Sequence, residues 1–237
     1  MNVNLGQVTI IAFCLVVAMK PAQSFELGGK TPTQAFPGID GALVQAAVDG
    51  NTTVMADLVK RGADPNAKGY EQLTPLIWAI SAHSHSGIGK LLELGADPNA
   101  SNSDFGSPTW LAANGNDTES LKILLEHGGN PNVAFDCKTA LIGAVRLIDR
   151  ARIDLLLLHG ADINSETCDE TAPQSAAALG QFDLVLYFLS KGYSRNLDRL
   201  AWYVADRHVK EDSDAFRDKM KAIELLRARG AKIPPIN

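Results

Sequence analysis

The sequence contains none of the motifs that mark a catalytic centre or a nucleic-acid surface. Its 237 residues carry 22 Lys and Arg against 27 Asp and Glu, a net charge of −5, so it lacks the basic excess typical of nucleic-acid binding. It has no Gly-x-Ser-x-Gly turn, phosphate-binding loop or His-Glu-x-x-His helix. We therefore predict a non-enzymatic protein that uses no cofactor and binds no nucleic acid.

A long apolar run is present only near the amino terminus, where Val8 to Met19 is apolar apart from Thr9. Small residues at Ala22 and Ser24 precede a possible cleavage point, and the run is too short to span a bilayer as a settled helix. We predict a signal peptide over residues 1–24, a periplasmic mature chain and no membrane insertion after cleavage. No Lys or Arg precedes the run, which leaves open a short anchor that stays attached, or lipid attachment at Cys14.

One stretch recurs along the rest of the chain. Leu91 to Asn99 reads Leu-Leu-Glu-Leu-Gly-Ala-Asp-Pro-Asn, and related stretches occupy residues 58–66, 124–132, 156–164, 188–196 and 225–233. Their glycines are spaced by 32 to 38 residues, and a period of about 33 residues is typical of a stacked solenoid. In each copy, we expect the glycine to end a helix in a left-handed conformation, and Asp-Pro-Asn to form the loop that follows.

A second motif precedes each of these stretches in the middle of the chain. Thr74-Pro75-Leu76-Ile77-Trp78-Ala79 predicts a helix start with a hydroxyl cap and proline at the first helical position. Related hexapeptides lie at residues 107–112, 139–144 and 171–176. Together the two motifs resemble those of ankyrin-repeat proteins over residues 39–233.

This resemblance implies an all-α solenoid of about six helix-turn-helix repeats, with loop tips forming a concave face. We place an ankyrin-repeat domain at residues 39–237, after a flexible lead-in at 25–38. The last repeat is expected to have an inner helix at 197–206 and a polar capping helix at about 214–229. Buried positions are predicted at two equivalent sets of side chains: Ala46, Ala79, Ala112, Ala144 and Ala176, and Leu58, Leu91, Leu124 and Leu156.

The chain departs from the family pattern in two ways. The histidine that usually joins neighbouring loops is replaced, so we expect looser loops; the replacing residues are Ile77, Trp110, Ile142 and Gln174. Residues 146–152 also lack the usual glycine between the helices.

Histidines and cysteines suggest no metal site. His127 and His159 each precede a helix-ending glycine, where a histidine favours the helix carboxyl end. His83 and His85 could share a metal, but no third ligand has a recognisable spacing, so we predict none. Cys137 and Cys168 lie in adjacent repeats about one helix diameter apart, roughly 10 Å, so we expect free thiols and leave a disulfide as the alternative.

The resemblance implies that a protein partner binds the loop tips and the exposed side of the inner helices. Aromatic and acidic residues alternate at the predicted tips, and large aromatics are typical interface anchors. The predicted partner-binding residues are Tyr70, Glu71, Leu73, Ser81, Asp104, Phe105, Asn114, Phe135, Asp136, Arg146 and Asp169. The alternative is that each aromatic ring folds back onto its neighbouring loop.

Two roles are consistent with this surface. The chain resembles periplasmic ankyrin-repeat immunity proteins, which implies a partner that is a toxin acting in the periplasm, such as a phospholipase effector of type VI secretion. The alternative is a scaffold or assembly factor for an envelope or oxidative-stress enzyme; a secreted protein acting on a host is a weaker third. In each case we expect a monomer when the partner is absent.

Overall fold

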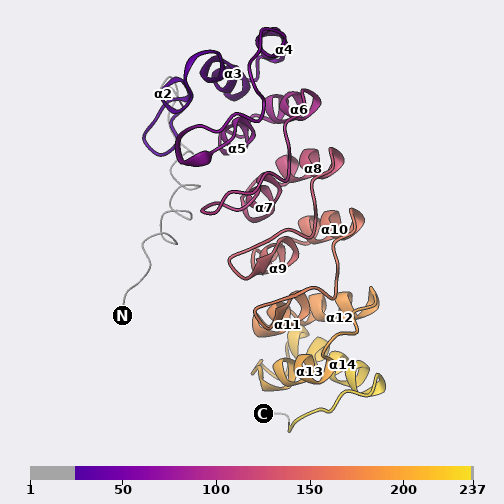
Figure 1. The fold of residues 1–237 in the computed structure, drawn as a ribbon. Helices are drawn as coiled ribbons and strands as arrows, with labels where there is room; N and C mark the ends of the chain where they lie inside the picture. The colour runs from indigo at the N-terminus through magenta and orange to yellow at the C-terminus, as the bar shows by residue number, and fades with distance from the viewer. Residues whose placement is uncertain (1–24, 236–237) are drawn as a thin grey trace. The chain divides into compact units, whose positions relative to one another are not determined.

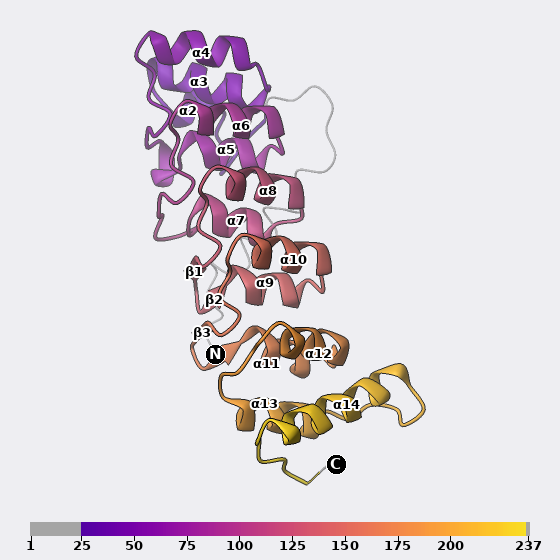
Figure 2. The same ribbon diagram turned by 90° about the vertical axis from the view of Figure 1, so that its right-hand side faces the viewer.

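The computed structural model describes residues 25–235, so the predicted signal peptide lies outside the described residues. Within them, six consecutive helix pairs are divided between two compact units, and the division falls between Val133 and Ala134. In each pair a short inner helix is followed by an outer helix (Figure 1; Figure 2). None of these helices has the length and hydrophobicity that crossing a bilayer requires.

Unit 1 contains three pairs and a short N-terminal helix. Its elements are α2 (Pro32–Ala35), α3 (Gly38–Val48), α4 (Thr52–Lys60), a 3-10 turn η2 (Tyr70–Gln72), α5 (Pro75–Ser81), α6 (His85–Glu93), α7 (Pro108–Asn114) and α8 (Thr118–Glu126). The inner helices are α3, α5 and α7.

Unit 2 contains the other three pairs and two short hairpins. Its elements are β1 (Ala134–Phe135), β2 (Lys138–Thr139), α9 (Ala140–Arg146), α10 (Arg150–Leu158), β3 (Glu166–Thr167), β4 (Glu170–Thr171), α11 (Ala172–Ala178), α12 (Phe182–Ser190), α13 (Leu197–Asp206) and α14 (Asp214–Ala228). Strand β1 pairs with β2, and β3 with β4, both antiparallel. The inner helices are α9, α11 and α13, and α14 is the long outer helix predicted for the last repeat.

The predicted helix boundaries follow from local chemistry. The Thr74 hydroxyl accepts a hydrogen bond from the Ile77 amide at 3.4 Å, and Thr139 caps α9 in the same way at 3.1 Å. At the other end of the repeat, Gly62 and Gly95 have φ values of 100° and 93°, the left-handed region in which a side chain would be strained. The Asp64 carboxylate accepts from the Asn66 amide at 2.8 Å, which closes the following turn.

The loops are tied together without the missing histidines, contrary to our expectation of looser loops. In unit 1, the Asn66 side chain donates to the Gly95 carbonyl and accepts from the Asp97 amide, both at 2.8 Å. Asn99 repeats this pattern with Gly128 and Asn130 one repeat later. The asparagine that ends each Gly-Ala-Asp-Pro-Asn stretch therefore makes the link between loops, while Ile77 and Ile142 are buried among apolar side chains.

The core is the one predicted from the repeat pattern. All nine alanines and leucines expected inside are buried, and each is at most 6% exposed.

His127, whose Nδ1 lies 2.8 Å from the Ile123 carbonyl, closes the end of α8 as a capping residue.

The residues that we expected to form a flexible lead-in are instead packed against α3 and α5 within unit 1. Leu27 and Lys30 form a two-residue hairpin around Gly28 and Gly29, whose φ values of 61° and 71° suit glycine. Leu27 and Phe36 are buried, and the rings of Phe25 and Phe36 stand edge-on to Trp78 at centroid distances of 6.0 and 6.2 Å. We call residues 25–37 the N-terminal strap.

A disulfide joins Cys137 and Cys168, so the prediction of free thiols is wrong. The two cysteines lie at the tips of neighbouring hairpins in unit 2, with Cα atoms 5.4 Å apart. The spacing of helix axes does not apply to these tips, because the hairpins lean together: the Thr167 hydroxyl donates to the Cys137 carbonyl at 2.9 Å.

Candidate protein-binding surface

The predicted aromatic anchors of unit 1 are engaged within the chain. Phe105 is partly buried and packs against the cluster around Trp78. Tyr70 is 40% exposed, but Lys30 of the strap lies 4.8 Å from its ring centroid. A hydrogen bond to Glu71 and the negative charge of that carboxylate raise the pKa of Tyr70. The alternative reading, in which the rings fold back onto neighbouring segments, therefore describes Phe105 and in part Tyr70.

The remaining predicted residues of unit 1 differ in exposure. Leu73 is only 3% exposed and belongs to the buried cluster, so it is not displayed to a partner. Glu71 and Asp104 are exposed at loop tips, whereas Ser81 and Asn114 are half-buried. The Asn114 amide donates to the Trp110 carbonyl at 3.0 Å, which fixes its side chain along α7.

The predicted residues of unit 2 are mostly exposed and paired. Phe135 is half-buried in β1, and Asp136 at the hairpin tip faces Lys138 at 3.7 Å. Arg146 at the end of α9 pairs with Glu170 at 2.7 Å, and Asp169 pairs with Arg199 of α13 at 3.4 Å.

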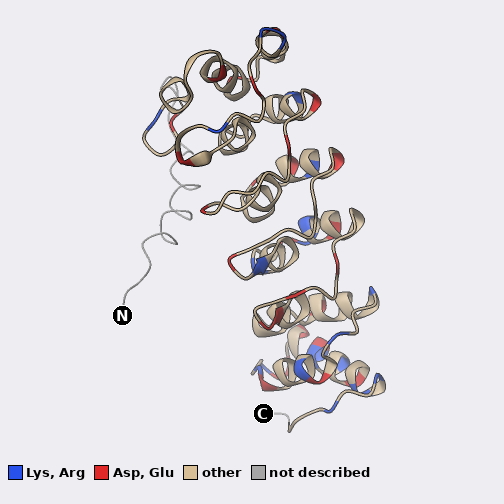
Figure 3. Ribbon diagram, in the orientation of Figure 1, with Lys and Arg blue, Asp and Glu red and all other residues tan. Residues whose placement is uncertain are grey.

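Acidic residues mark the loop tips that precede α7, α9 and α11 (Figure 3). In unit 2 much of that negative charge is compensated by arginine. Glu166 forms ion pairs with Arg195 at 2.6 Å and with Arg199 at 3.4 Å. Steering of a basic partner by these tips is therefore weaker than the sequence alone suggests.

Unit 2 displays large apolar side chains that sequence reasoning did not select. Leu147 and Ile148 follow α9, Leu179 follows α11, and Trp202 lies on α13; they are 45%, 52%, 41% and 51% exposed. We call these four side chains the apolar row. Leu147 and Leu179 occupy the same position relative to the caps Thr139 and Thr171, so they recur directly after consecutive inner helices. Arg146 lies beside the row and pairs with Glu170.

One feature of the sequence, which we noted only as a departure from the family pattern, could have indicated this row. Residues 146–152 lack the usual glycine, and Ile148 takes its place with a φ of 55°. A β-branched residue rarely adopts this conformation, and exposed large apolar side chains often mark interaction sites.

The two histidines considered for a metal converge on a carboxylate in unit 1. Asp117, the cap of α8, lies 2.7 Å from His85 Nε2 and 3.2 Å from His83 Nδ1. Burial opposes ionisation of this carboxyl, but hydrogen bonds from Ser120, His85 and His83 outweigh it and hold the pKa of Asp117 well below its usual range. Among the described residues, no group of three or more His, Cys, Asp or Glu is arranged to hold a metal ion.

The chain matches two family models, both of ankyrin repeats. A model of three ankyrin-repeat copies matches residues 90–167, and a single-repeat model matches residues 71–103. A comparison with curated proteins finds no match. Ankyrin repeats are typically protein-interaction modules rather than enzymes.

Among solved structures, the fold is similar to the ankyrin-repeat domain of human ASB11. The TM-score is 0.59 at 22% sequence identity, over 80% of this chain and 84% of that one. At this identity the similarity establishes the fold alone. The chain therefore contains ankyrin repeats and has the ankyrin-repeat fold, with α3–α4, α11–α12 and α13–α14 as helix pairs outside the matched residues.

Proposed function

We propose that this chain is a non-enzymatic module that binds one protein partner through the apolar row of unit 2. The observation that carries the proposal is the row itself, four exposed large side chains on three consecutive inner helices or the turns that follow them. Tryptophan and other large apolar residues dominate binding energy at protein interfaces. Arg146 supplies a charged group at the edge of the row.

The experiment compares the parent chain with two variants. A Leu147→Ser/Leu179→Ser double variant should lose at least about 2 kcal/mol of binding, the effect of removing interface anchors. Leu158→Ser is the matched control, because Leu158 is 80% exposed at the end of the outer helix α10. The partner is first captured from the native host with the parent chain, and affinities are then measured with purified proteins. Equal binding by all three chains would refute the row as the binding surface.

We further propose that the chain is exported to the periplasm. The disulfide supports this location, because such bonds persist in oxidising compartments and are rare in the cytosol. The intact mass of protein purified from its native host should correspond to a chain that begins at or near Phe25. A mass that retains residues 1–24 would contradict export with cleavage.

Within the envelope, we propose immunity toward a toxin as the role, and a scaffold for an envelope or oxidative-stress enzyme as the alternative. The proposal of immunity rests on the resemblance of the sequence to periplasmic ankyrin-repeat immunity proteins. A toxin gene beside this gene, and rescue of cells that express the toxin in the periplasm, would support immunity. An enzyme gene in that place, with activity lost when this chain is deleted, would support the scaffold.

A further inference from the structure

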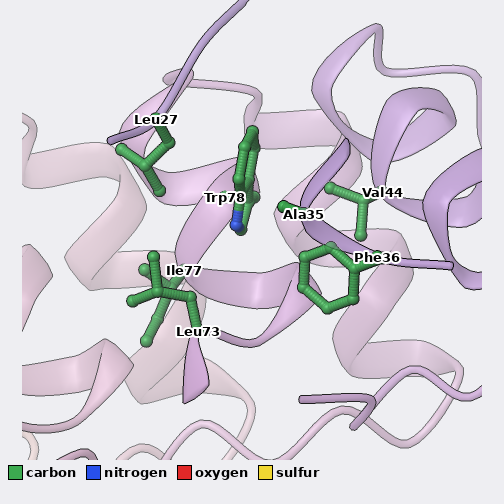
Figure 4. Close-up of a cluster of buried hydrophobic side chains, with 7 residues drawn as sticks. All are labelled: Leu27, Ala35, Phe36, Val44, Leu73, Ile77 and Trp78. Atoms are coloured by element: carbon green, nitrogen blue, oxygen red, sulfur yellow. The ribbon is translucent and has the colours of Figure 1, made fainter. Parts of the chain in front are cut away.

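The strap covers apolar side chains on the inner side of unit 1. Trp78 lies on α5 and Leu111 on α7, at equivalent positions of consecutive inner helices, and both contact the cluster that Leu27 and Phe36 of the strap help to form. Figure 1 shows α2 on the side of α3 and α5 that is opposite the outer helices. Figure 4 shows Trp78 between Leu27 and Ala35, with Phe36 beside them.

The strap makes close contacts with Gly69 and Tyr70. Phe36 fits against the Gly69 backbone so closely that a Cβ at Gly69 would lie 2.6 Å from the ring. Gly28 lies against the Tyr70 ring, and the Lys30 ammonium stands 4.8 Å from its centroid. The strap thus fills an aromatic-lined surface with two phenylalanines and a leucine, as a bound peptide would.

The same surface contains one unsatisfied polar group. The Trp78 indole N–H is buried and has no hydrogen-bond partner among the described residues. Burying an unpaired donor is unfavourable, so the packing around Trp78 carries a free-energy cost in the closed state. Around Trp78, the contacts between the strap and the rest of unit 1 are those of apolar side chains.

We propose that the N-terminal strap is a built-in peptide ligand of unit 1, which closes the surface over Trp78 until a segment with similar aromatic and leucine side chains displaces it. This inference is independent of the apolar row of unit 2. It assigns a peptide-binding site to unit 1, in addition to the proposed partner surface of unit 2. The occupant of this site is the strap, residues 25–37 of the same chain.

The test uses a labelled synthetic peptide of residues 25–37 and the full chain. In the parent, the attached strap competes at an effective concentration in the millimolar range, so the peptide should bind at least about tenfold more tightly to a Leu27→Asp chain than to the parent. Thr33→Asp, at an exposed position of the strap, is the control and should behave as the parent. A second variant, Phe25→Ser, should release the strap by removing the contact between the Phe25 and Trp78 rings. It serves as a check in case Leu27→Asp perturbs α3.

The docking side of the site is tested in the Leu27→Asp background. Gly69→Ala should abolish peptide binding, since its Cβ occupies the place of the Phe36 ring, whereas Gly89→Ala, with no atom closer than 4.0 Å, should leave binding intact. A peptide that carries Leu27→Asp should bind no chain. Equal peptide binding to parent and both released variants, or no binding to any, would overturn the proposal. A parent dimer that the peptide dissociates would show that the strap docks on a second copy and would overturn it as well.

Discussion

Ile148 holds a backbone conformation that suits glycine, and its side chain is half exposed. The left-handed region costs a non-glycine residue roughly 1–2 kcal/mol. Ile148→Gly should therefore raise the free energy of unfolding by about 1 kcal/mol. The gain is smaller than the full cost because glycine has more conformational entropy in the unfolded chain. Urea denaturation measures the change. Leu147→Gly, at a neighbouring position with φ −80°, should be destabilising, and a loss of stability in Ile148→Gly would contradict the assignment.

The same Ile148→Gly variant should also bind the partner less tightly than the parent does. That result would indicate that Ile148 costs stability but contributes to binding. Strain of this kind concentrates at functional sites.

Asp117 links two turns of unit 1 through its carboxylate. Because its pKa is lowered on folding, its stabilisation is fully present above the unfolded pKa of about 3.9 and is lost as the pH falls through the folded value. Asp117→Asn should cost about 1 kcal/mol at neutral pH, the usual effect of weakening a cap and its hydrogen bonds.

Urea denaturation of the parent and the variant from pH 7 to pH 3 measures this dependence. The gap between the two should narrow below pH 4, because the carboxyl is then protonated in the unfolded chain while it stays ionised in the folded one. Glu119→Gln on the first turn of α8 is the exposed control. A gap that stays constant down to pH 3 would contradict the role of the charge.

At the scale of elements, the disulfide joins the β1–β2 hairpin to the β3–β4 hairpin, between which the Thr167 hydroxyl also bonds to the Cys137 carbonyl. Cys137 and Cys168 are 31 residues apart, and cross-linking a loop of that length contributes about 3–4 kcal/mol in the chain-entropy model. Reduction should therefore lower the thermal midpoint of the parent. Cys137→Ser should melt like the reduced parent and be insensitive to reductant. A parent whose melting is unchanged by reductant would mean that the bond is absent or without effect.

The elements also show where sequence reasoning succeeds. Caps such as Thr74 and Thr139, terminal glycines, and the inner and outer helices of the last repeat were predicted because each depends on residues within a few positions of one another. Loop linkage was mispredicted, because Asn66 and Asn99 bond to carbonyls 29 residues away and only the fold reveals that distance.

At the scale of the whole molecule, the same limit applies to the site. The predicted anchors were chosen by residue type at loop tips, but Phe105 turns inward to the Trp78 cluster and Leu73 is buried. Exposure of Leu147, Leu179 and Trp202 depends on how neighbouring repeats cover each inner helix, which residue type does not specify. The strap was missed because it has no periodic apolar pattern and is ordered by contacts with α3 and α5.

The central claim is that the inner-helix side of unit 2 binds the protein partner while the strap keeps the surface over Trp78 closed. Amide hydrogen exchange of the full mature chain, with and without the captured partner, tests it most directly. We predict slower exchange on binding at residues 143–150, 176–181 and 199–205, and no change at residues 69–82. Slower exchange confined to residues 25–133, or to the outer helices α10 and α12, would contradict the account.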